Sequence, residues 1–534
     1  MVKLINTGDV LHMLEFRRPD EYLPFCGLPS PSWGYGLPSA AHPHISYSAD
    51  GSTCYLLDGI TGTNIVAMPN HLEVKRLYAE NLRIDANDAD GPFLQSLQDI
   101  CVWDETLENG VRTCKWLASK CRRNIQLRLK LDFPNINTET IIETCVKGQL
   151  SLGSLDLSVS SERIDFSAFT DICGTGTCLS LSHSDNFESW NKKHTDAIQA
   201  THDSFGQAAV RTRPKYLRVE GDSFEKMSAH PFFWHVGQSE LTGTEAIVLR
   251  GLRLCAEDCV LLRKALSQSQ VRSFYISDCT VPDVASFILI LASLPALDGI
   301  RISNLEFESS SGSIDCVLPE AKFICLQGLR PEFAWSMESL LGEHTEHLSI
   351  TDCRLSGSHL RQCRLRLRGC SRIRHLSLND VDFAEEILNS LPNPSKLAFL
   401  SVRNSAVSGS SLRQFFAQTG NMKVLDIRES GLGLSISELP KSLTSISLHS
   451  LEPMLERGLS DCAQGLRQVV LDSSVELAEI RKFQRNLPQV LNLICPNDFQ
   501  SIVDNGLVII SPSYFTDVIP SAGLSSLVEF SDAC

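Results

Sequence analysis

The chain has 534 residues, of which 43% are hydrophobic and 21% are charged, and its 48 basic and 63 acidic residues give a formal net charge of −15. This composition is typical of a folded globular protein, and it excludes a wholly disordered chain, a collagen-like fibre and a protein with many membrane spans. The negative charge also argues against a general nucleic-acid binder, because such proteins hold phosphates through an excess of Lys and Arg.

The beginning of the chain and its cysteines predict a reducing compartment. Asp9 and Glu15 interrupt the apolar runs near the N-terminus, so we expect no export signal. The 19 cysteines are an odd number and are spread over the whole chain. We therefore expect a cytoplasmic protein, or a nuclear one, whose cysteines are free thiols.

Membrane spans, metals and other cofactors are not expected. The longest apolar run, 284–294, reads VASFILILASL and is far shorter than the roughly 20 residues that cross a bilayer, so a buried helix is expected there. The pairs Cys173/Cys178 and Cys255/Cys259 lack a second pair at zinc-finger spacing.

Residues 1–70 differ from the rest of the chain, because seven of its 23 prolines lie there between short apolar pieces. The string HISYSADGSTCYLLDG, around Asp50-Gly51, predicts a hairpin with a tight turn. We expect this segment to be an irregular N-terminal cap that covers the open end of a repeat array.

Residues 71–240 contain a degraded form of a short apolar phrase that becomes regular further on. Around Asn124 the string NIQLRLKLDF alternates as a strand does. The polar stretch 183–214 is long for a connection and predicts an insertion or a mobile loop. The degraded phrases start at Val74, Leu152, Gly176 and Pro214.

Residues 241–495 repeat one phrase ten times: apolar-x-x-apolar-x-apolar-x-x-(Leu, Cys, Val or Ser)-x-apolar. Two examples are TEHLSITDCRL and IRHLSLNDVDF. Successive starts are 21 to 28 residues apart. The phrases start at Thr244, Val271, Leu297, Ala321, Thr345, Ile373, Leu397, Met422, Leu443 and Leu466.

This phrase resembles that of the leucine-rich repeat family, LxxLxLxxNxL at steps of about 20 to 29 residues. Cys279 and Cys353 stand where the family has Asn, which resembles the ribonuclease-inhibitor-like and cysteine-containing types, whereas Leu and Val at other repeats depart from both. The resemblance implies an α/β solenoid, with a curved parallel sheet on the concave side and helices on the convex side. Residues 71–240 are then degenerate leucine-rich repeats and 241–495 regular ones.

Segments between the phrases have helical spacing of apolar residues, which fits helices on the convex side. The C-terminal residues 496–534 mix VIISPSYF with Ser and Pro, and we expect a C-terminal cap with a strand. The predicted helices are 256–267, 283–294, 382–391 and 411–418.

The side chains beside the buried positions of each strand point outward, and they are the candidates for binding. Parallel strands lie about 4.8 Å apart, so residues at one register position form a row. The position two places after the start of four successive phrases holds an aromatic or imidazole ring, with charged residues beside the row, and such residues dominate protein interfaces. The predicted partner-binding residues are Phe323, His347, His375, Phe399, Arg403, Asp426 and Arg428. Partial burial by local packing is the alternative interpretation of the rings.

A second candidate surface is the run from Arg354 to Arg374, which has many arginines and no acid. In an acidic chain this local positive charge could receive an acidic peptide or a phosphate. A solvated helical face is the alternative interpretation.

The sequence predicts no enzyme, because it has no GxxxxGK[ST], HExxH or GxSxG motif and no evident small-molecule site. The resemblance implies a scaffold that binds a partner protein on its concave face. The net charge and the short apolar runs predict that neither nucleic acid nor membrane is a partner. Two alternatives stay open. One is a substrate-recognition subunit of a ubiquitin ligase, although 1–70 does not resemble an F-box, and the other is a regulator of a small GTPase.

Overall fold

The computed structural model divides into two compact units, which we describe separately: unit 2 holds 23–319 and 518–533, and unit 1 holds 320–517 with both chain ends. In addition to the ranges given in the next sentence, the structure describes the backbone of the strands that lie outside them. The structure describes residues 165–170, 173–183, 192–221, 226–239, 241–294, 297–309, 318–328, 340–354, 357–427, 438–449, 465–466, 468–471, 475–488, 490 and 492–494.

Unit 2 is built on a parallel sheet in which each strand pairs with the next one along the chain. The strands are β3 (Thr53–Leu57), β4 (Arg76–Glu80), β5 (Asp99–Asp104), β6 (Gln126–Phe133), β7 (Ser151–Val159), β8 (Cys173–His183), β9 (Tyr216–Glu220), β10 (Ala246–Arg250), β11 (Ser273–Ser277) and β13 (Leu297–Ser303).

The sheet of unit 2 begins with antiparallel strands. β2 (His44–Tyr47) pairs with β3 across Asp50-Gly51, so the predicted hairpin is confirmed. β1 (Phe25–Cys26) pairs with β2 on its other side. The other residues of the predicted N-terminal cap lie outside the described residues.

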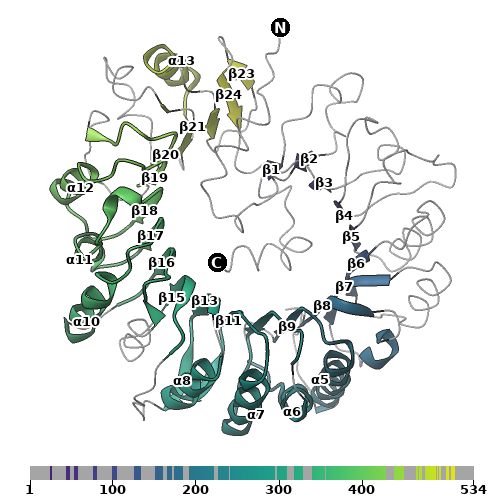
Figure 1. The fold of residues 1–534 in the computed structure, drawn as a ribbon. Helices are drawn as coiled ribbons and strands as arrows, with labels where there is room; N and C mark the ends of the chain where they lie inside the picture. The colour runs from purple at the N-terminus through teal and green to yellow at the C-terminus, as the bar shows by residue number, and fades with distance from the viewer. Residues whose placement is uncertain are drawn as a thin grey trace, which may run out of the picture. The chain divides into compact units, whose positions relative to one another are not determined.

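The helices of unit 2 all lie on the same side of its strands (Figure 1). Their apolar residues pack against the inward face of the sheet, as α8 shows: Phe287, Ile288 and Leu291 are fully buried. The helices are η2 (Phe166–Phe169), α5 (Lys192–Thr212), α6 (His230–Gln238), α7 (Ala256–Ser267) and α8 (Val284–Ala292).

The prediction of an insertion or mobile loop at 183–214 is wrong, because α5 occupies most of it. The helix buries Ile198, His202, Phe205 and Ala209, which are three or four residues apart. The Phe205 ring contacts Phe232 of α6 with centroids 5.7 Å apart. The polar residues that favoured a loop are the solvent-facing side of a regular connecting helix.

Unit 1 repeats the same plan. Its parallel strands are β15 (Ala321–Gln327), β16 (His347–Thr351), β17 (His375–Asn379), β18 (Phe399–Arg403), β19 (Val424–Asp426), β20 (Ser445–Leu448), β21 (Gln468–Leu471), β22 (Asn492–Ile494) and β24 (Leu507–Ile510). β23 (Ser501–Val503) pairs antiparallel with β24, which pairs with β22, so the expected C-terminal strand is present. The helices are α10 (Gly357–Leu367), α11 (Ala384–Leu388), η4 (Pro394–Lys396), α12 (Gly409–Phe416) and α13 (Leu477–Asn486).

The strands form where the phrase has its alternating apolar pair. In β16, Leu348 and Ile350 point inward and are at most 1% exposed, and Leu376 and Leu378 do the same in β17. Their partners across the strands are inward too, because the register is constant from β15 to β18. The alternation therefore builds one continuous apolar layer under each sheet.

The sheet strands from β10 to β18 are each followed by a residue with positive φ. This position is Asp278 (φ 53°) after β11 and Asn304 (φ 49°) after β13, and it is Asp380 (φ 55°) after β17. Asn, Asp and Gly tolerate this left-handed conformation best. The same position is occupied in other repeats by Gly251, Gly328, Asp352 and Asn404.

The next residue bridges neighbouring repeats. The Sγ atom of Cys279 accepts from the backbone N–H of Leu252 (3.4 Å) and lies 3.1 Å from the carbonyl oxygen of Ser277, to which its thiol donates. Ser405 makes the same pair of contacts: its Oγ accepts from Val381 N (3.1 Å) and donates to Arg403 O (2.7 Å). Cys and Ser thus do at the strand exit what Asn does in the family's phrase.

The ten regular phrases all contain a strand, and the predicted helices are present as α7, α8, α11 and α12. Parallel strands on one side and helices on the other make each unit an α/β leucine-rich repeat solenoid, which confirms the predicted fold class. The boundary between the units falls inside the predicted regular array. The predicted domains 1–70, 71–240, 241–495 and 496–534 divide the chain by the regularity of its phrase and stay a prediction.

Candidate functional site

Four rings stack in a row on the outward face of unit 1, and we call them the ring column: Phe323, His347, His375 and Phe399. The strand register places each one opposite the next. The ring centroids are 4.3 Å apart for the first pair, 4.2 Å for the two histidines and 5.7 Å for the last pair. The interplanar angles fall from 33° to 17° along the row. The column is therefore a continuous stack across four strands.

The members of the ring column are not equally accessible. His347 is only 5% exposed, because its two neighbours cover both faces of its ring. Phe323, His375 and Phe399 are half-buried. A partner that approaches this face meets the edges of these three rings, and His347 holds them in line.

A lysine lies at the first ring of the column. The ammonium group of Lys322 is 5.0 Å from the centroid of the Phe323 ring, within the range of a cation–π contact. The same group pairs with Glu346 at 3.6 Å. The column thus ends in a charged group that is already partly neutralised.

A row of polar side chains runs beside the ring column. Asn379 Nδ2 donates to Ser377 Oγ, and Ser401 Oγ donates to Asn379 Oδ1, both at 3.2 Å. Arg403 Nε donates to Asp426 Oδ2 at 2.8 Å, and a terminal guanidinium nitrogen contacts the same oxygen. Asp426 is nearly buried and Arg403 is half-buried. This row presents hydrogen-bonding groups whose positions are fixed by neighbouring strands.

The structure brings together six of the seven residues predicted to bind a partner, on the strands β15 to β19, and Arg428 lies outside the described residues. What the sequence missed is the stacking itself, whereas the burial of His347 agrees with the alternative interpretation that local packing covers the rings. The register rule gives the row, but it does not give the rotamers that turn the rings face to face.

The outward face of unit 2 carries charges that pair with one another. Arg218 contacts Glu220 at 2.7 Å on β9, and Arg250 of β10 lies 3.7 Å from the same carboxylate. The next strand continues the row, because Arg250 Nε donates to Asp278 at 3.3 Å. These charges already pair with one another, so this face is a weaker candidate than the ring column.

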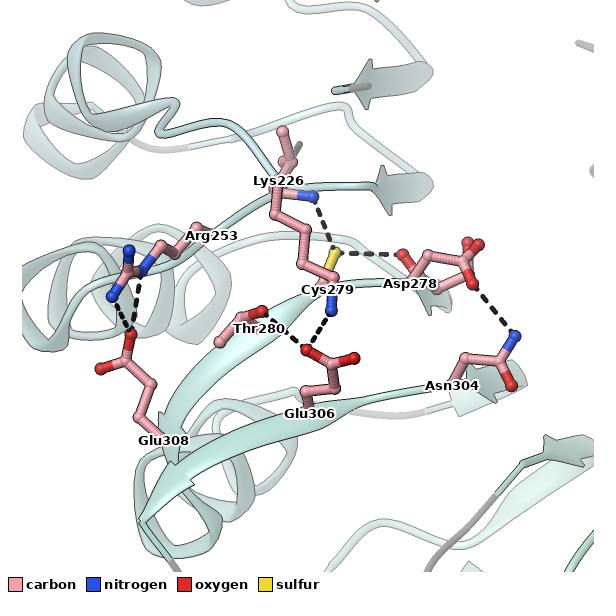
Figure 2. A network of polar contacts seen from close by, with 10 residues as sticks. Lys226, Arg253, Asp278, Cys279, Thr280, Asn304, Glu306 and Glu308 are labelled. Atoms are coloured by element: carbon pink, nitrogen blue, oxygen red, sulfur yellow. Dashed lines mark hydrogen bonds and ion pairs between the residues drawn. The ribbon is translucent and has the colours of Figure 1, made fainter. Parts of the chain in front are cut away.

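A second, two-stranded sheet follows the strand exits of unit 2. β12 (Thr280–Asp283) pairs with β14 (Glu306–Ser309), and charged side chains lie across it (Figure 2). Lys226 Nζ is 2.5 Å from Glu306 Oε2, and Arg253 donates twice to Glu308, at 2.9 and 2.7 Å. These two contacts join repeats that are not successive, because Lys226 follows β9 and Arg253 follows β10, whereas both glutamates lie on β14, after β13.

One group near α7 has the donor atoms of a metal site. His230, Cys255 and Asp258 bring their ligand atoms within 4.8 Å of one another. Both carboxylate oxygens of Asp258 are engaged, one 2.6 Å from His230 Nδ1 and the other accepting from Cys255 N at 2.9 Å. Burial and the Asp258 carboxylate raise the pKa of the Cys255 thiol, which opposes the thiolate that a metal needs. The capping box of α7 accounts for this group.

No protein-family model and no curated protein matches the chain. Among the solved structures that match is the crystal structure of the TLR13–ssRNA13 complex, which is 13% identical with a TM-score of 0.29. The match covers 81% of this chain and 59% of that chain, so this chain spans less than two thirds of the length of the neighbour. A similarity this low carries no argument, and the fold assignment rests on the strands and helices described above. Within the described residues, no helix combines the length and apolarity needed to cross a bilayer.

Proposed function

We propose that this protein is a non-catalytic scaffold that binds a partner protein through the outward face of the strands of unit 1. The observation that supports the proposal best is the ring column, in which four rings stack across β15 to β18 and three of them keep accessible edges. Aromatic rings fixed on a rigid sheet offer a large contact area and lose little conformational entropy on binding.

The polar row beside the column completes this surface. Arg403 is half-exposed and is held by Asp426, so its guanidinium is oriented before a partner arrives. Buried apolar contacts surrounded by oriented polar groups are the usual arrangement of a protein interface. A cytoplasmic or nuclear location and the lack of an enzymatic activity are parts of the same proposal.

We further infer that the repeats belong to the ribonuclease-inhibitor-like or cysteine-containing type. Cys279 and Cys353 support this, because each thiol donates to the carbonyl oxygen two residues earlier, at 3.1 and 3.2 Å. A role in a ubiquitin ligase or in GTPase regulation has no specific support in the described residues, and the experiment below tests both.

The experiment compares the full chain with a variant carrying Phe323→Ala, His375→Ala and Phe399→Ala. Both are used for affinity purification from reduced native lysate, and each recovered protein is then purified and titrated. The matched control carries Arg250→Ala and Ser277→Ala on the outward face of unit 2. Circular dichroism checks that all three are folded.

We expect one partner whose affinity falls at least about 30-fold in the ring-column variant, since a hot-spot side chain contributes about 2 kcal/mol or more. The control variant should bind that partner as the natural chain does. Equal binding by all three proteins overturns the proposal. Recovery of ubiquitin-ligase core subunits or of a small GTPase would select one of the alternatives.

A further inference from the structure

The helix α10 and the residue after it present arginines and one leucine to solvent, and we call Arg361, Leu365, Arg366 and Arg368 the α10 basic face. Its inward side is apolar, since Cys363 and Leu367 are fully buried. With 3.6 residues per turn, the residues four before and three after Leu365 lie beside it on the outward side. These are Arg361 and Arg368, and both are exposed. Arg366 is exposed on the other flank of the leucine.

Leu365 is unusual in being exposed. Its exposed fraction is 62%, and among the described residues of unit 1 no other large hydrophobic side chain belongs to the exposed class. Covering a leucine side chain with apolar surface of a partner favours binding. A single exposed leucine needs no explanation by itself, but here it lies between positive charges that keep the surface soluble while the chain is unbound.

The arginines of this face have no acidic partner among the described side chains. No ion pair involves Arg361, Arg366 or Arg368 there, whereas Arg403 and Arg413 of the same unit are paired with Asp426 and Glu438. Arg364 lies three residues after Arg361 and four before Arg368, and like charges at these spacings weakly destabilise a helix. The uncompensated charge is therefore a small cost in the isolated chain.

Glu385 of the next repeat does not compensate this charge. Glu385 of α11 accepts a hydrogen bond from the backbone N–H of Ser408 at 3.0 Å, so it is held toward the following repeat. Arg364 of α10 donates to Ser390 Oγ at 3.3 Å and is the one arginine of the helix turned toward its neighbour. The α10 basic face is left as a positive surface on a chain whose net charge is −15.

We propose that the α10 basic face docks an acidic segment of another protein, which lays an apolar side chain on Leu365 and places carboxylates on Arg361, Arg366 and Arg368. Arginine suits this task because its planar guanidinium binds carboxylates with two parallel hydrogen bonds. A peptide fits better than a nucleic acid, because a phosphate backbone offers nothing apolar to cover Leu365 and the rest of the chain repels it. This surface lies on the helix side of unit 1, away from the strand face of the proposed scaffold (Figure 1).

The test uses the full chain and a synthetic fluorescent peptide with a central Leu-Leu pair flanked on both sides by Asp and Glu. Two peptides serve as controls, one with Ser-Ser at the centre and one with Asn and Gln in place of the acids. Binding is followed by fluorescence anisotropy at low salt and at about 1 M salt, where charges are screened beyond about 3 Å. A single-stranded oligonucleotide and vesicles with anionic lipid are titrated in parallel.

Two variants of the protein locate the site. R361E/R368E reverses the charge of the α10 basic face, and L365S removes its apolar centre. The matched control, R481E/R485E, makes the same change of charge on α13, another exposed helix of unit 1. All these side chains are exposed, so we expect folded proteins, which circular dichroism verifies.

We expect the acidic Leu-Leu peptide to bind at least tenfold more tightly than either control peptide, and high salt to weaken it. R361E/R368E should lower its affinity by tenfold or more, L365S by about threefold or more, and R481E/R485E by less than twofold. The proposal is overturned if the peptide does not bind below about 1 mM, if the variants on α10 and α13 behave alike, or if the oligonucleotide or the vesicles bind more tightly than the peptide. The ring-column variant should bind the peptide normally, so failure here is distinguishable from failure of the scaffold proposal.

Discussion

The strands β9, β10, β11 and β13 of unit 2 and β15 to β19 of unit 1 have the same kind of inward side chain, which is buried and apolar. Their outward side chains differ in kind. Inward, both regions place buried aliphatic residues such as Leu249 and Leu378 at matching positions of the phrase. Outward, unit 2 has ion pairs such as Arg218–Glu220, whereas unit 1 has stacked rings. The buried positions therefore maintain the stacking of the repeats, while the outward positions can carry different side chains at the same strand register.

The largest expected effect concerns the shared inward side. Leu249→Ala and Leu376→Ala should each lower the free energy of unfolding by about 2–5 kcal/mol, because each leaves a cavity under a fully buried leucine. Urea denaturation with hydrogen exchange of each strand measures the loss in its own unit. The control Ser377→Ala, on the outward side of the same strand, should cost about 0.5 kcal/mol or less. Similar losses for the leucines and the serine would break the inward–outward distinction.

The second prediction separates the two regions by pH, since the fully buried His202 of α5 belongs to unit 2. Burial lowers the pKa of His202 from 6.5 to about 4. Between these two values the unfolded chain binds more protons than the folded one, so this contribution to stability is complete above pH 6.5 and is lost as the pH falls toward 4. The loss should approach roughly 3 kcal/mol.

This prediction is checked by measuring the urea midpoint of unit 2 from neutral pH downward. His202→Leu should flatten the dependence on pH in this window, whatever its effect at neutral pH. The exposed His344 serves as the control, because His344→Leu should keep the slope of the natural chain. Equal slopes in His202→Leu and the natural chain would contradict the burial argument.

The ring column itself gives the third prediction. His347→Ala should lower the stability of unit 1 by about 1–3 kcal/mol, because a ring pair contributes about 0.5–1.5 kcal/mol and His347 contacts two rings. Ser349→Ala, two residues along the same strand, should change it little. Thermal unfolding measures the loss of stability in both variants. Equal shifts of the melting temperature would mean that stacking of the His347 ring does not stabilise unit 1.

The fourth prediction tests whether the strand exits of the two regions are equivalent. Cys279→Ala should cost about 1–2 kcal/mol, since it removes a thiol donor and the acceptor of the Leu252 N–H. Cys279→Ser should cost clearly less, because Ser405 makes the same contacts in unit 1. Denaturation midpoints of the two variants are compared, and an Ala variant as stable as the Ser variant would show that packing alone matters there.

The smallest expected effect lies in the charged second sheet of unit 2. Glu308→Gln breaks its pair with Arg253, and both side chains are exposed, at 42% and 64%. Exposed ion pairs contribute about 0–1 kcal/mol, so the midpoint of unfolding should move very little and less still at high salt. A loss as large as that of Cys279→Ala would show that this network holds the repeats together.

Much of the fold follows from the sequence, because an alternating apolar pair can bury only one side of a strand. The phrases beginning at Thr244 and Ile373 became β10 and β17 for this reason. α5 was missed, because polar residues fill its outward side and small ones such as Ala209 form part of its buried side. The polar residues then favour a loop, although the buried residues have helical spacing.

The candidate site followed from the sequence in position and not in detail. Counting two places from each phrase start puts His347 and His375 side by side, and the register does so. Their stacking depends on side-chain rotamers, and the burial of His347 depends on rings that belong to other repeats. Properties that depend on contacts between neighbouring repeats cannot be predicted from the sequence of a single phrase.

The left-handed residue that follows the sheet strands from β10 to β18 has a consequence for how repeat sequences of this kind are detected by sequence comparison. That residue is Gly, Asn or Asp wherever the structure describes it with positive φ at this place, as with Gly251, Asn304 and Asp380. The residue after it is Leu, Cys, Val or Ser in different repeats, since several side chains can fill its space. A sequence profile that gives its highest weight to the bridging Asn will overlook divergent arrays of this kind, whereas one that weights the backbone-constrained position before it will align them.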